Sequence, residues 1–315
     1  QTFKNIWTIE ELRSKIVVTL TLILIYRVGV HIVLPGIDPN KLSDAQSTTN
    51  NGLLGLFDTF AGGAFSRASI FALGVMPYIS ASIFMQLMTI LVPQMQKIQK
   101  EGESGRKKIN QWTRYLTVVV TILQSSAYVA YLRTPGYAEA MIPAYQPYFF
   151  LSTIVILTAG SMFVMWLGEK ITDKGLGNGI SLIIMVGIMA RLPFALFSEL
   201  VARMEQKGGG LVLFIVEIAV LVMVVLLCIL LVQGTRKIPV QYAKRVVGNK
   251  QYGGVRQYIP LKVNAAGVMP IIFAQAIMFL PLTIAGFASS ESLQGFAATF
   301  TNINGFWYNF TYAIL

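Results

Sequence analysis

The sequence predicts an all-α membrane protein whose chain crosses the bilayer several times. Hydrophobic residues make up 55% of its 315 residues and charged residues only 12%, whereas a soluble domain carries about 25% charged residues. Apolar runs of roughly 20 residues recur along the chain, each long enough to cross about 30 Å of hydrocarbon as a helix. Lysine and arginine gather in alternate connections between these runs. Together the three observations exclude an ordinary soluble fold.

The apolar runs give the expected order of helices. The first, near residues 16–34, is too long for the apolar part of a secretory signal and lacks a clear small-residue cleavage site, so we expect it to be retained. An eighth run begins at Phe306 and stops at Leu315, about half the length needed to cross, so the chain looks cut inside a span. The helices between them are expected near residues 68–92, 115–133, 147–168, 179–198, 210–233 and 265–287.

The distribution of cations orients these spans. The N-terminal tail and every second loop carry roughly three cations for each one in the other loops, and basic loops are the cytoplasmic ones. We therefore expect the N-terminus to lie in the cytoplasm. The formal net charge of +11 then belongs mainly to the cytoplasmic face.

Two cytoplasmic loops, residues 94–114 and 234–262, are long and strongly basic. Topology determination and contact with anionic lipid explain such charge. A docking platform for a large, negatively charged partner, such as ribosomal RNA or an acidic protein surface, explains it as well. The second loop contains the strand-like sequence QYGGVRQYIPL, which favours a platform. The candidate contact residues are Arg106, Lys107, Lys108, Lys244, Arg245, Lys250 and Arg256.

Residues 51–66 form an apolar segment outside the membrane, between the first two spans. The segment is too short to cross, has glycines near both ends and carries Asp58 in its middle. It is either an interfacial helix on the outer leaflet or a re-entrant segment buried in protein, and residue types do not decide between the two. Its apolar members are Leu53, Leu54, Leu56, Phe57 and Phe60.

Two spans carry features that interrupt a regular helix. Pro77 in the second span predicts a kink, and the seventh span has Gly267 and Pro270 near its start. In the second span, Val75, Ile79 and Ile83 recur every four residues and therefore share one helix face. Polar side chains that could bond a neighbouring helix are Ser80, Gln124 and Asn264.

A glycine-rich turn precedes the fifth span. Gly175, Gly177 and Gly179 allow the backbone to bend freely and leave room for something to pass. Asn178 puts a polar side chain at the mouth of a span, where only water or protein makes it tolerable. The turn therefore predicts a wet cavity at the membrane face.

The residue inventory excludes several kinds of chemistry. Cys228 and His31 are the only cysteine and histidine, so disulfides, cysteine or histidine metal sites and a Ser-His-Asp triad are excluded. The sequence contains no nucleotide-binding loop of the GxxxxGK[ST] type. We expect no enzyme activity, no cofactor and no metal. The rival class is a secondary transporter of a small solute, in which Arg27 and Glu217 are candidate coupling charges.

Five long strings of this chain resemble the SecY family, whose members form the channel of the bacterial Sec protein translocon. They occur in the family's order, and the resemblance covers the chain from the N-terminus to the end of the seventh helix. The family has ten spans in two inverted halves of five. The resemblance implies that residues 1–198 form the first half and residues 199–315 the start of the second. The strings are GGAFSRASIFALGVMPYISASI (62–83), EGESGRKK (101–108), MWLGEKITDKGLGNGIS (165–181), YAKR (242–245) and PLKVNAAGVMP (260–270).

The resemblance also implies residue roles. Residues 51–66 correspond to the plug that closes the outer half of the channel. Val75, Ile79, Ile180, Ile184 and Ile272 correspond to the pore ring, where the family usually has isoleucine, so Val75 is a mild departure. Residues on the second, third and seventh helices correspond to the lateral gate; these are Ser80, Ile83, Gln124, Asn264 and Met269.

The function that the resemblance implies is a protein-conducting channel in the bacterial inner membrane. Such a channel moves unfolded secretory polypeptides across the membrane and releases signal sequences and transmembrane segments sideways into lipid. The implied partners are SecE, SecG, the nascent polypeptide, and the SecA motor or the ribosome at the two basic loops. The aliphatic central positions favour this passive conduit over a transporter, which needs polar groups near the midplane.

Overall fold

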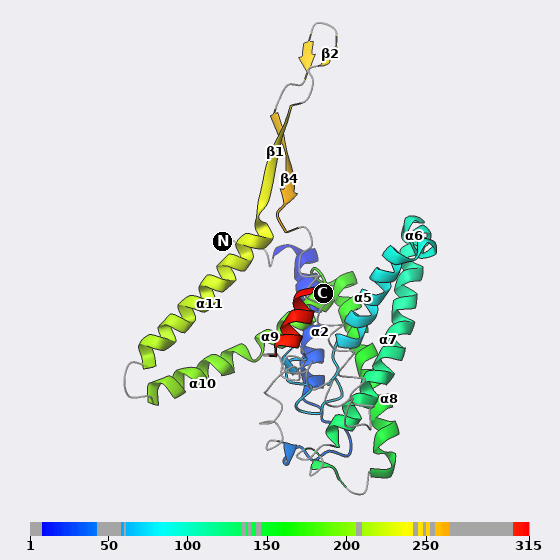
Figure 1. The fold of residues 1–315 in the computed structure, drawn as a ribbon, viewed down its shortest axis with the longest axis vertical. Helices are drawn as coiled ribbons and strands as arrows, with labels where there is room; N and C mark the ends of the chain where they lie inside the picture. Colours follow the sequence, from blue (N-terminus) through cyan, green and yellow to red (C-terminus); the bar gives the residue numbers. More distant parts are fainter. Residues whose placement is uncertain are drawn as a thin grey trace. The chain divides into compact units, whose positions relative to one another are not determined.

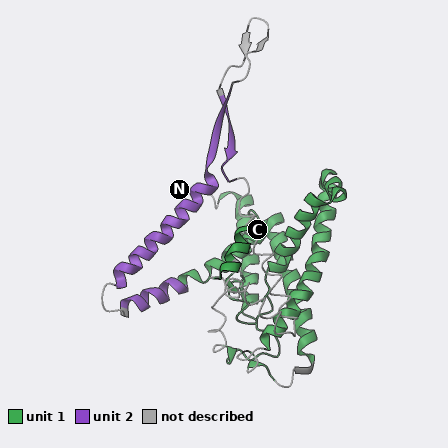
Figure 2. Cartoon of the chain, in the orientation of Figure 1, with its two compact units in different colours: residues 1–193, 274–315 green, residues 194–273 purple. Residues whose placement is uncertain are grey.

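The computed structural model describes residues 8–42, 58–59, 61–133, 137, 140–142, 146–205, 210–241, 245–247, 250–252, 256–264 and 305–314 (Figure 1). The chain divides into two compact units (Figure 2). Unit 1 contains residues 1–193 and 274–315, and unit 2 contains residues 194–273. Unit 1 consists of helices and irregular segments where it is described, and unit 2 of helices and a β-ribbon.

The helices of unit 1 pack around one apolar core. Helix α5 packs against α7, α7 against α8, α8 against α9, and α2 against α8. Val30 of α2, Val129 of α7 and Leu157 of α8 are fully buried in this core. The helices are α2 (Glu10–Val30), α5 (Met76–Leu91), α6 (Pro93–Lys100), α7 (Glu103–Leu132), α8 (Gln146–Lys174), α9 (Gly179–Met189) and α14 (Phe306–Ile314).

Four described helical stretches are long and apolar enough to cross a membrane. They are α7, most of α8, residues Gly179–Met204 and α11. The bent pair α5 and α6 makes a fifth if it counts as one span. The expectation of a multi-pass helical membrane protein is therefore confirmed.

The prediction for the second span is wrong at its start. Residues 68–75 form turns, and the helix begins only at Met76. Ala68 and Gly74 have φ values of 45° and 52°, a left-handed conformation that a right-handed helix cannot contain. The predicted kink at Pro77 is also wrong, because Pro77 lies in the first turn of α5, where its missing N–H leaves no helical bond unmade.

The prediction of a loop over residues 94–114 is wrong as well. Helix α6 and the first turns of α7 occupy this stretch, and α6 is bent by 101° from α5. Val92 at the bend is extended, the conformation that a following proline imposes. Helix α7 therefore begins twelve residues before the predicted third span at residue 115, as a charged helix that runs on into apolar sequence.

The predicted fifth span, residues 179–198, lies within the apolar helical stretch Gly179–Met204, which contains a short turn. Helix α9 ends at Met189, and α10 (Leu192–Glu205) begins after a turn at Ala190 and Arg191. At its start, the Asn178 side chain accepts hydrogen bonds from the backbone N–H groups of Ile180 and Ser181 at 3.1 and 3.3 Å. This is the bonding of a helix N-cap.

Unit 2 consists of a helix pair and a ribbon. An ion-pair cluster joins α10 to α11 (Gly210–Gln233), because Arg203 lies 2.8 Å from Glu199 and 2.6 Å from Glu217. Strand β1 (Thr235–Gln241) pairs antiparallel with β4 (Arg256–Lys262), and β2 (Arg245–Val247) pairs with β3 (Lys250–Tyr252). The strand expected within QYGGVRQYIPL is therefore confirmed. The predicted seventh span, residues 265–287, lies outside the described residues.

Candidate functional site

A segment that is mostly non-helical is buried inside unit 1; of its described residues only Asp58 and Thr59 are helical. We call it the buried loop and define it as residues 58–59 and 61–75; most of its side chains are buried. Its backbone pairs with the chain that follows α2: Leu34 N–H donates to the Ala68 carbonyl at 2.8 Å, and Ile70 N–H donates to the Ile32 carbonyl at 3.0 Å. Such bonding allows irregular backbone to lie at the depth of a membrane, provided that protein surrounds it.

Phe71 fixes the buried loop between α2 and α8. Its ring stacks on Tyr26 at 6.2 Å and on Phe163 at 5.9 Å between centroids. A Cβ atom at Gly29 of α2 would overlap the Phe71 ring, and one at Gly160 of α8 would overlap the backbone of the loop. Each helix therefore has a glycine at the point where the loop approaches it most closely.

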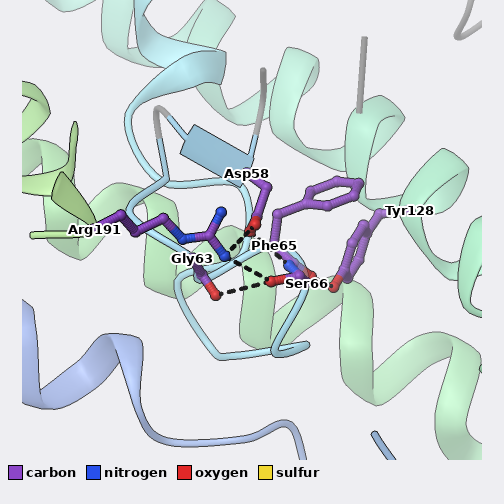
Figure 3. Close-up of polar contacts among 6 residues, drawn as sticks. All are labelled: Asp58, Gly63, Phe65, Ser66, Tyr128 and Arg191. Carbon is purple, nitrogen blue, oxygen red and sulfur yellow. Dashed lines mark hydrogen bonds and ion pairs between the residues drawn. The ribbon is translucent and has the colours of Figure 1, made fainter. Parts of the chain in front are cut away.

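Tyrosine hydroxyls bond the first half of the loop. Tyr128 of α7 donates to the Phe65 carbonyl at 2.7 Å, and the two rings meet edge to face at 4.8 Å (Figure 3). Tyr26 donates to the Ala61 carbonyl at 3.4 Å. Both hydroxyls are buried and satisfy backbone groups that water would otherwise have to satisfy.

An ion pair joins the loop to the end of α9. Arg191 Nη2 lies 2.6 Å from Asp58 Oδ2, and the Asp58 side chain is only 1% exposed. The other carboxylate oxygen of Asp58 accepts from Ser66 N–H at 2.8 Å, and Arg191 donates to the Ser66 hydroxyl at 3.4 Å (Figure 3). A buried carboxylate is tolerated when a cation and hydrogen bonds both meet it.

Two glycines lie in the turn beneath this ion pair. Gly62 and Gly63 have φ values of 66° and 86°, the left-handed region that other residues rarely adopt. A Cβ at Gly63 would lie 3.2 Å from the Arg191 guanidinium, and one at Gly62 would lie 2.9 Å from Gly187 of α9. The turn therefore packs directly on the last turns of α9 and on the residue that follows them.

Of the two interpretations of residues 51–66, the described part favours the second. Asp58 and residues 61–66 are buried in protein, as a re-entrant segment would be and an interfacial helix would not. The predicted plug residues themselves, Leu53, Leu54, Leu56, Phe57 and Phe60, lie outside the described residues.

The predicted pore-ring residues lie on two helices of unit 1. Val75 is the last residue of the buried loop and directly precedes α5, and Ile79 in the first turn of α5 donates its N–H to the Val75 carbonyl at 3.1 Å. Val75 is buried, while Ile79, and Ile180 and Ile184 of α9, are half-buried. Val75 belongs to the core cluster, and Ile79 and Ile180 pack against it. Ile272 lies outside the described residues.

The predicted gate residues are divided between the units. Ile83 of α5 and Gln124 of α7 are buried, and Ser80 is half-buried, all in unit 1. Asn264 follows β4 in unit 2. Met269 lies outside the described residues. Since α5 and α7 pack against each other, the structure brings the unit 1 members onto one helix pair.

The basic residues of the two predicted loops are exposed where the structure describes their side chains. Arg106, Lys107 and Lys108 lie at the start of α7, and acidic neighbours partly neutralise them. Lys107 lies 3.1 Å from Glu103, and Lys108 lies 3.7 Å from Glu101. Arg245, Lys250 and Arg256 lie in the ribbon, and Lys244 lies outside the described residues.

The glycine-rich turn at residues 175–179 is tighter than its sequence predicts. A Cβ at Gly179 would overlap the backbone of Gly168 in α8, and one at Gly175 would overlap the Thr19 hydroxyl of α2. Only Gly177, with φ of 66°, faces open space. Two of the three glycines therefore allow close helix packing instead of leaving room for a passing chain.

Sequence reasoning missed the ion pair at Asp58 and the burial of residues 67–75. A signal was present for the ion pair. Asp58 is the only acid of an otherwise apolar segment, and Arg191 interrupts the apolar run of the fifth span. A charge in apolar surroundings needs a partner, although the sequence did not identify which one.

Comparison with known proteins identifies the family. The SecY family model matches residues 69–315. The SecY protein translocase subunit of Streptomyces scabiei is 42% identical over 304 residues, covering 94% of this chain and 69% of that protein. The SecY subunit of Aquifex aeolicus is 39% identical over 312 residues, covering 98% of this chain and 72% of that protein.

Solved structures show the same fold at lower identity. A protein-conducting channel matches with a TM-score of 0.61 at 17% identity, covering 88% of this chain and 60% of that one. Sec61 in the canine ribosome–channel complex matches with a TM-score of 0.59 at 17% identity, over the same shares of the two chains. The sequence and fold comparisons agree, and the chain belongs to the SecY family.

Proposed function

We propose that this chain forms part of a protein-conducting channel. It would move unfolded secretory polypeptides across the membrane and release signal sequences and transmembrane segments sideways into lipid. The observation that carries the proposal is the buried loop of a SecY-family chain, held within the helices that bear the aliphatic residues Val75, Ile79, Ile180 and Ile184. Residues 51–66 are then the plug, and these side chains, with Ile272, are the pore ring.

A ring of branched aliphatic side chains suits this task. When the channel is empty, its apolar walls exclude water and therefore ions. When a polypeptide passes, the ring offers it no ionic or hydrogen-bonding contact that would hold it in place. Ile79, Ile180 and Ile184 are half-buried, which suits side chains that line a path and are also supported by a core.

The lateral gate would open between the second span, which contains α5, and the seventh span, residues 265–287. A signal sequence is an apolar helix of roughly 7–15 residues, so it gains by exchanging a channel wall for lipid. Ser80 of α5 and Gln124 of α7 would supply polar contacts in the closed gate, and Ile83 of α5 an apolar one. The candidates from the seventh span are Asn264 and Met269. The exposed apolar residues Phe84 and Ile90 of α5 suit a helix that faces lipid.

The ribbon would be the docking element for the cytoplasmic motor or the ribosome. Side chains alternate across an antiparallel ribbon, so the register assigns them to two faces. One face carries Arg236, Ile238, Val240, Ile259 and Leu261. The opposite face carries Lys237, Tyr258 and Lys262, a basic surface suited to nucleic-acid phosphates or acidic side chains.

The cation distribution supports a cytoplasmic N-terminus in a bacterial inner membrane, with both basic regions on the cytoplasmic side. SecE and SecG are the small membrane partners, and SecA or the ribosome binds from the cytoplasm. A transporter is the weaker alternative. Its candidate coupling charge Glu217 is ion-paired with Arg203, as a structural residue would be.

Resting ion conductance tests the pore ring. Ile79→Asn and Ile184→Asn, in the assembled complex in a planar bilayer, should each raise the resting conductance several-fold, because a polar side chain lets the constriction fill with water. Phe84→Asn and Met185→Asn, at exposed positions of the same helices, are the matched controls. Equal conductance in the ring variants and the wild type would refute the ring.

A further inference from the structure

We propose that Asp58 and Arg191 form an ionic latch that holds the plug segment closed. The latch joins the buried loop to the end of α9, and opening of the channel requires the two side chains to separate. The proposal rests on the proposed function, because it assumes that residues 51–66 are the plug and that Ile180 and Ile184 of α9 belong to the pore ring. Its basis is the ion pair of 2.6 Å with its surrounding hydrogen bonds.

The two partners have unequal environments. The Asp58 side chain is 1% exposed and the Arg191 side chain is 40% exposed. The carboxylate therefore depends on the arginine for its counter-charge, whereas the arginine can turn towards water at a small cost. An ion pair with one exposed partner separates more readily than a wholly buried one, and this asymmetry suits a contact that must break in use.

The position of the pair in the chain couples two functional elements. Asp58 directly follows residues 51–57, the apolar part of the predicted plug. Arg191 comes two residues after the end of α9, whose first turns carry Ile180 and Ile184. A displacement of either element must change the distance between the two side chains. The contact therefore couples the position of the plug segment to that of the helix that carries the pore-ring residues.

The anchors of the buried loop differ along its length. Residues 65–71 are held by apolar and aromatic contacts, such as Phe71 between Tyr26 and Phe163. Asp58 is held by its ion pair with Arg191 and by the hydrogen bond that it accepts from Ser66 N–H. Gly62 and Gly63 lie between the two anchors, in the left-handed backbone region. The loop is therefore built to pivot at these glycines, with its aromatic end fixed and its charged end released.

A double-mutant cycle tests the latch. The variants are Asp58→Asn, Arg191→Gln, the pair of both, and Arg191→Lys, which keeps the charge. Asn at position 58 retains an oxygen for Ser66 N–H, so the substitution removes charge with little change of shape. Arg133→Gln, an exposed outer cation that lies 5.8 Å from the Phe150 ring, is the control. Resting conductance and precursor export are measured in the full complex, and recovery of the assembled complex checks folding.

Each single neutralisation should raise resting conductance about tenfold or more, as the loss of a charge-assisted contact implies. The double variant should resemble the single ones, because the second change has no contact left to remove. Arg191→Lys and Arg133→Gln should stay near wild type. If the Asp58→Asn protein does not assemble, the latch is tested by the two Arg191 variants alone: Arg191→Gln should leak ions and Arg191→Lys should not.

Three results would overturn the latch. Conductance in the single variants could equal wild type, their effects could multiply in the double variant, or Arg191→Lys could leak as much as Arg191→Gln. Ile184→Asn in the same experiment separates this failure from failure of the channel. If it leaks and the latch variants do not, only the latch is wrong, and if it also fails to leak, the proposed function is wrong.

Discussion

Gly29 illustrates how a single residue allows the buried loop to exist. The Phe71 ring occupies the space that a side chain at position 29 would need. Tyr26, three residues earlier on α2, stacks on the same ring. The absence of a side chain at Gly29 therefore leaves room for Phe71 against α2, and the Tyr26 ring packs on it.

Gly29→Ala should lower the stability of the protein. The added methyl group forces the Phe71 ring out of its stack, and overpacking of this kind costs about 1–3 kcal/mol. The apparent Tm in detergent, followed by aggregation or circular dichroism, measures the effect. Val28→Ala, a neighbour on α2 that is 58% exposed, should leave the Tm almost unchanged. A Gly29→Ala protein as stable as wild type would mean that the ring does not occupy this space.

At the residue scale, the sequence predicted the positions of residues that are close in the chain better than it predicted contacts between residues that are far apart in it. Val75 and Ile79 were predicted on one helix face from local periodicity; Ile79 N–H does donate to the Val75 carbonyl, but Val75 precedes α5 and is not part of the helix. The pairing of Asp58 with Arg191 joins segments far apart in sequence, and no local rule selects it. The positive φ of Ala68 was equally unpredictable, since alanine carries no signal for that conformation.

The turn between α8 and α9 illustrates how an element boundary is fixed. Asn178 caps α9 through two backbone bonds. The Thr172 hydroxyl accepts from Gly179 N–H at 2.9 Å, and the Thr19 hydroxyl of α2 accepts from Leu176 N–H at 3.1 Å. Side-chain oxygens thus satisfy N–H groups that the helix start leaves free.

Asn178→Ala should destabilise the protein by about 1 kcal/mol, the usual cost of losing an N-cap. The apparent Tm of the purified complex should fall, and hydrogen exchange at Ile180 and Ser181 should accelerate. Asn178→Ser keeps an oxygen acceptor and should recover most of the loss. Unchanged exchange at these two amides in the alanine variant would count against the cap.

The predicted boundaries of helices were wrong where the helix does not have the same limits as the apolar run. The charged start of α7 was predicted as loop because it is not apolar, yet a helix continues beyond a membrane when its backbone bonds are intact. Pro77 was predicted to kink a span, but it begins one. Both errors come from equating an apolar run with a helix, and the proline error also from ignoring the preference of proline for the first helical turn.

At the scale of the whole molecule, the placement of charge supports the proposed docking role of the ribbon. The cations Lys237 and Lys262 lie on one face of the β1–β4 pair. An isolated two-stranded ribbon is only marginally stable in water, and several of its apolar side chains, such as Ile259 and Leu261, are about half exposed. A partner that covers the ribbon would stabilise it.

Lys237→Gln with Lys262→Gln should weaken binding of the chain's complex to ribosomes or to the SecA motor. Loss of two cations should also flatten the salt dependence of binding, because fewer counterions are exchanged. Co-sedimentation or surface binding at several salt concentrations measures both effects. Lys15→Gln, a cation of α2 paired with Glu11, is the control. Binding that keeps its wild-type affinity and salt slope would exclude the basic face.

The family was the most predictable feature of the whole molecule. Long strings such as residues 62–83 and 165–181 carried the resemblance, and the family comparison confirmed it. The same strings did not predict the path of the backbone through them. Residues 68–75, within the first string, turn inside the protein because Phe71, Gly29 and Gly160 fit together in three dimensions.

The central claim is that a translocating polypeptide passes the side chains of α5 and α9. A photo-reactive amino acid at Ile79, Ile180 or Ile184, with a secretory precursor arrested halfway through export, tests it most directly. The account predicts crosslinks to the precursor from all three positions, and crosslinks to lipid alone from Phe84 and Ile90, which are 50% and 67% exposed. Precursor crosslinks from Phe84 and Ile90, with none from the three isoleucines, would contradict it.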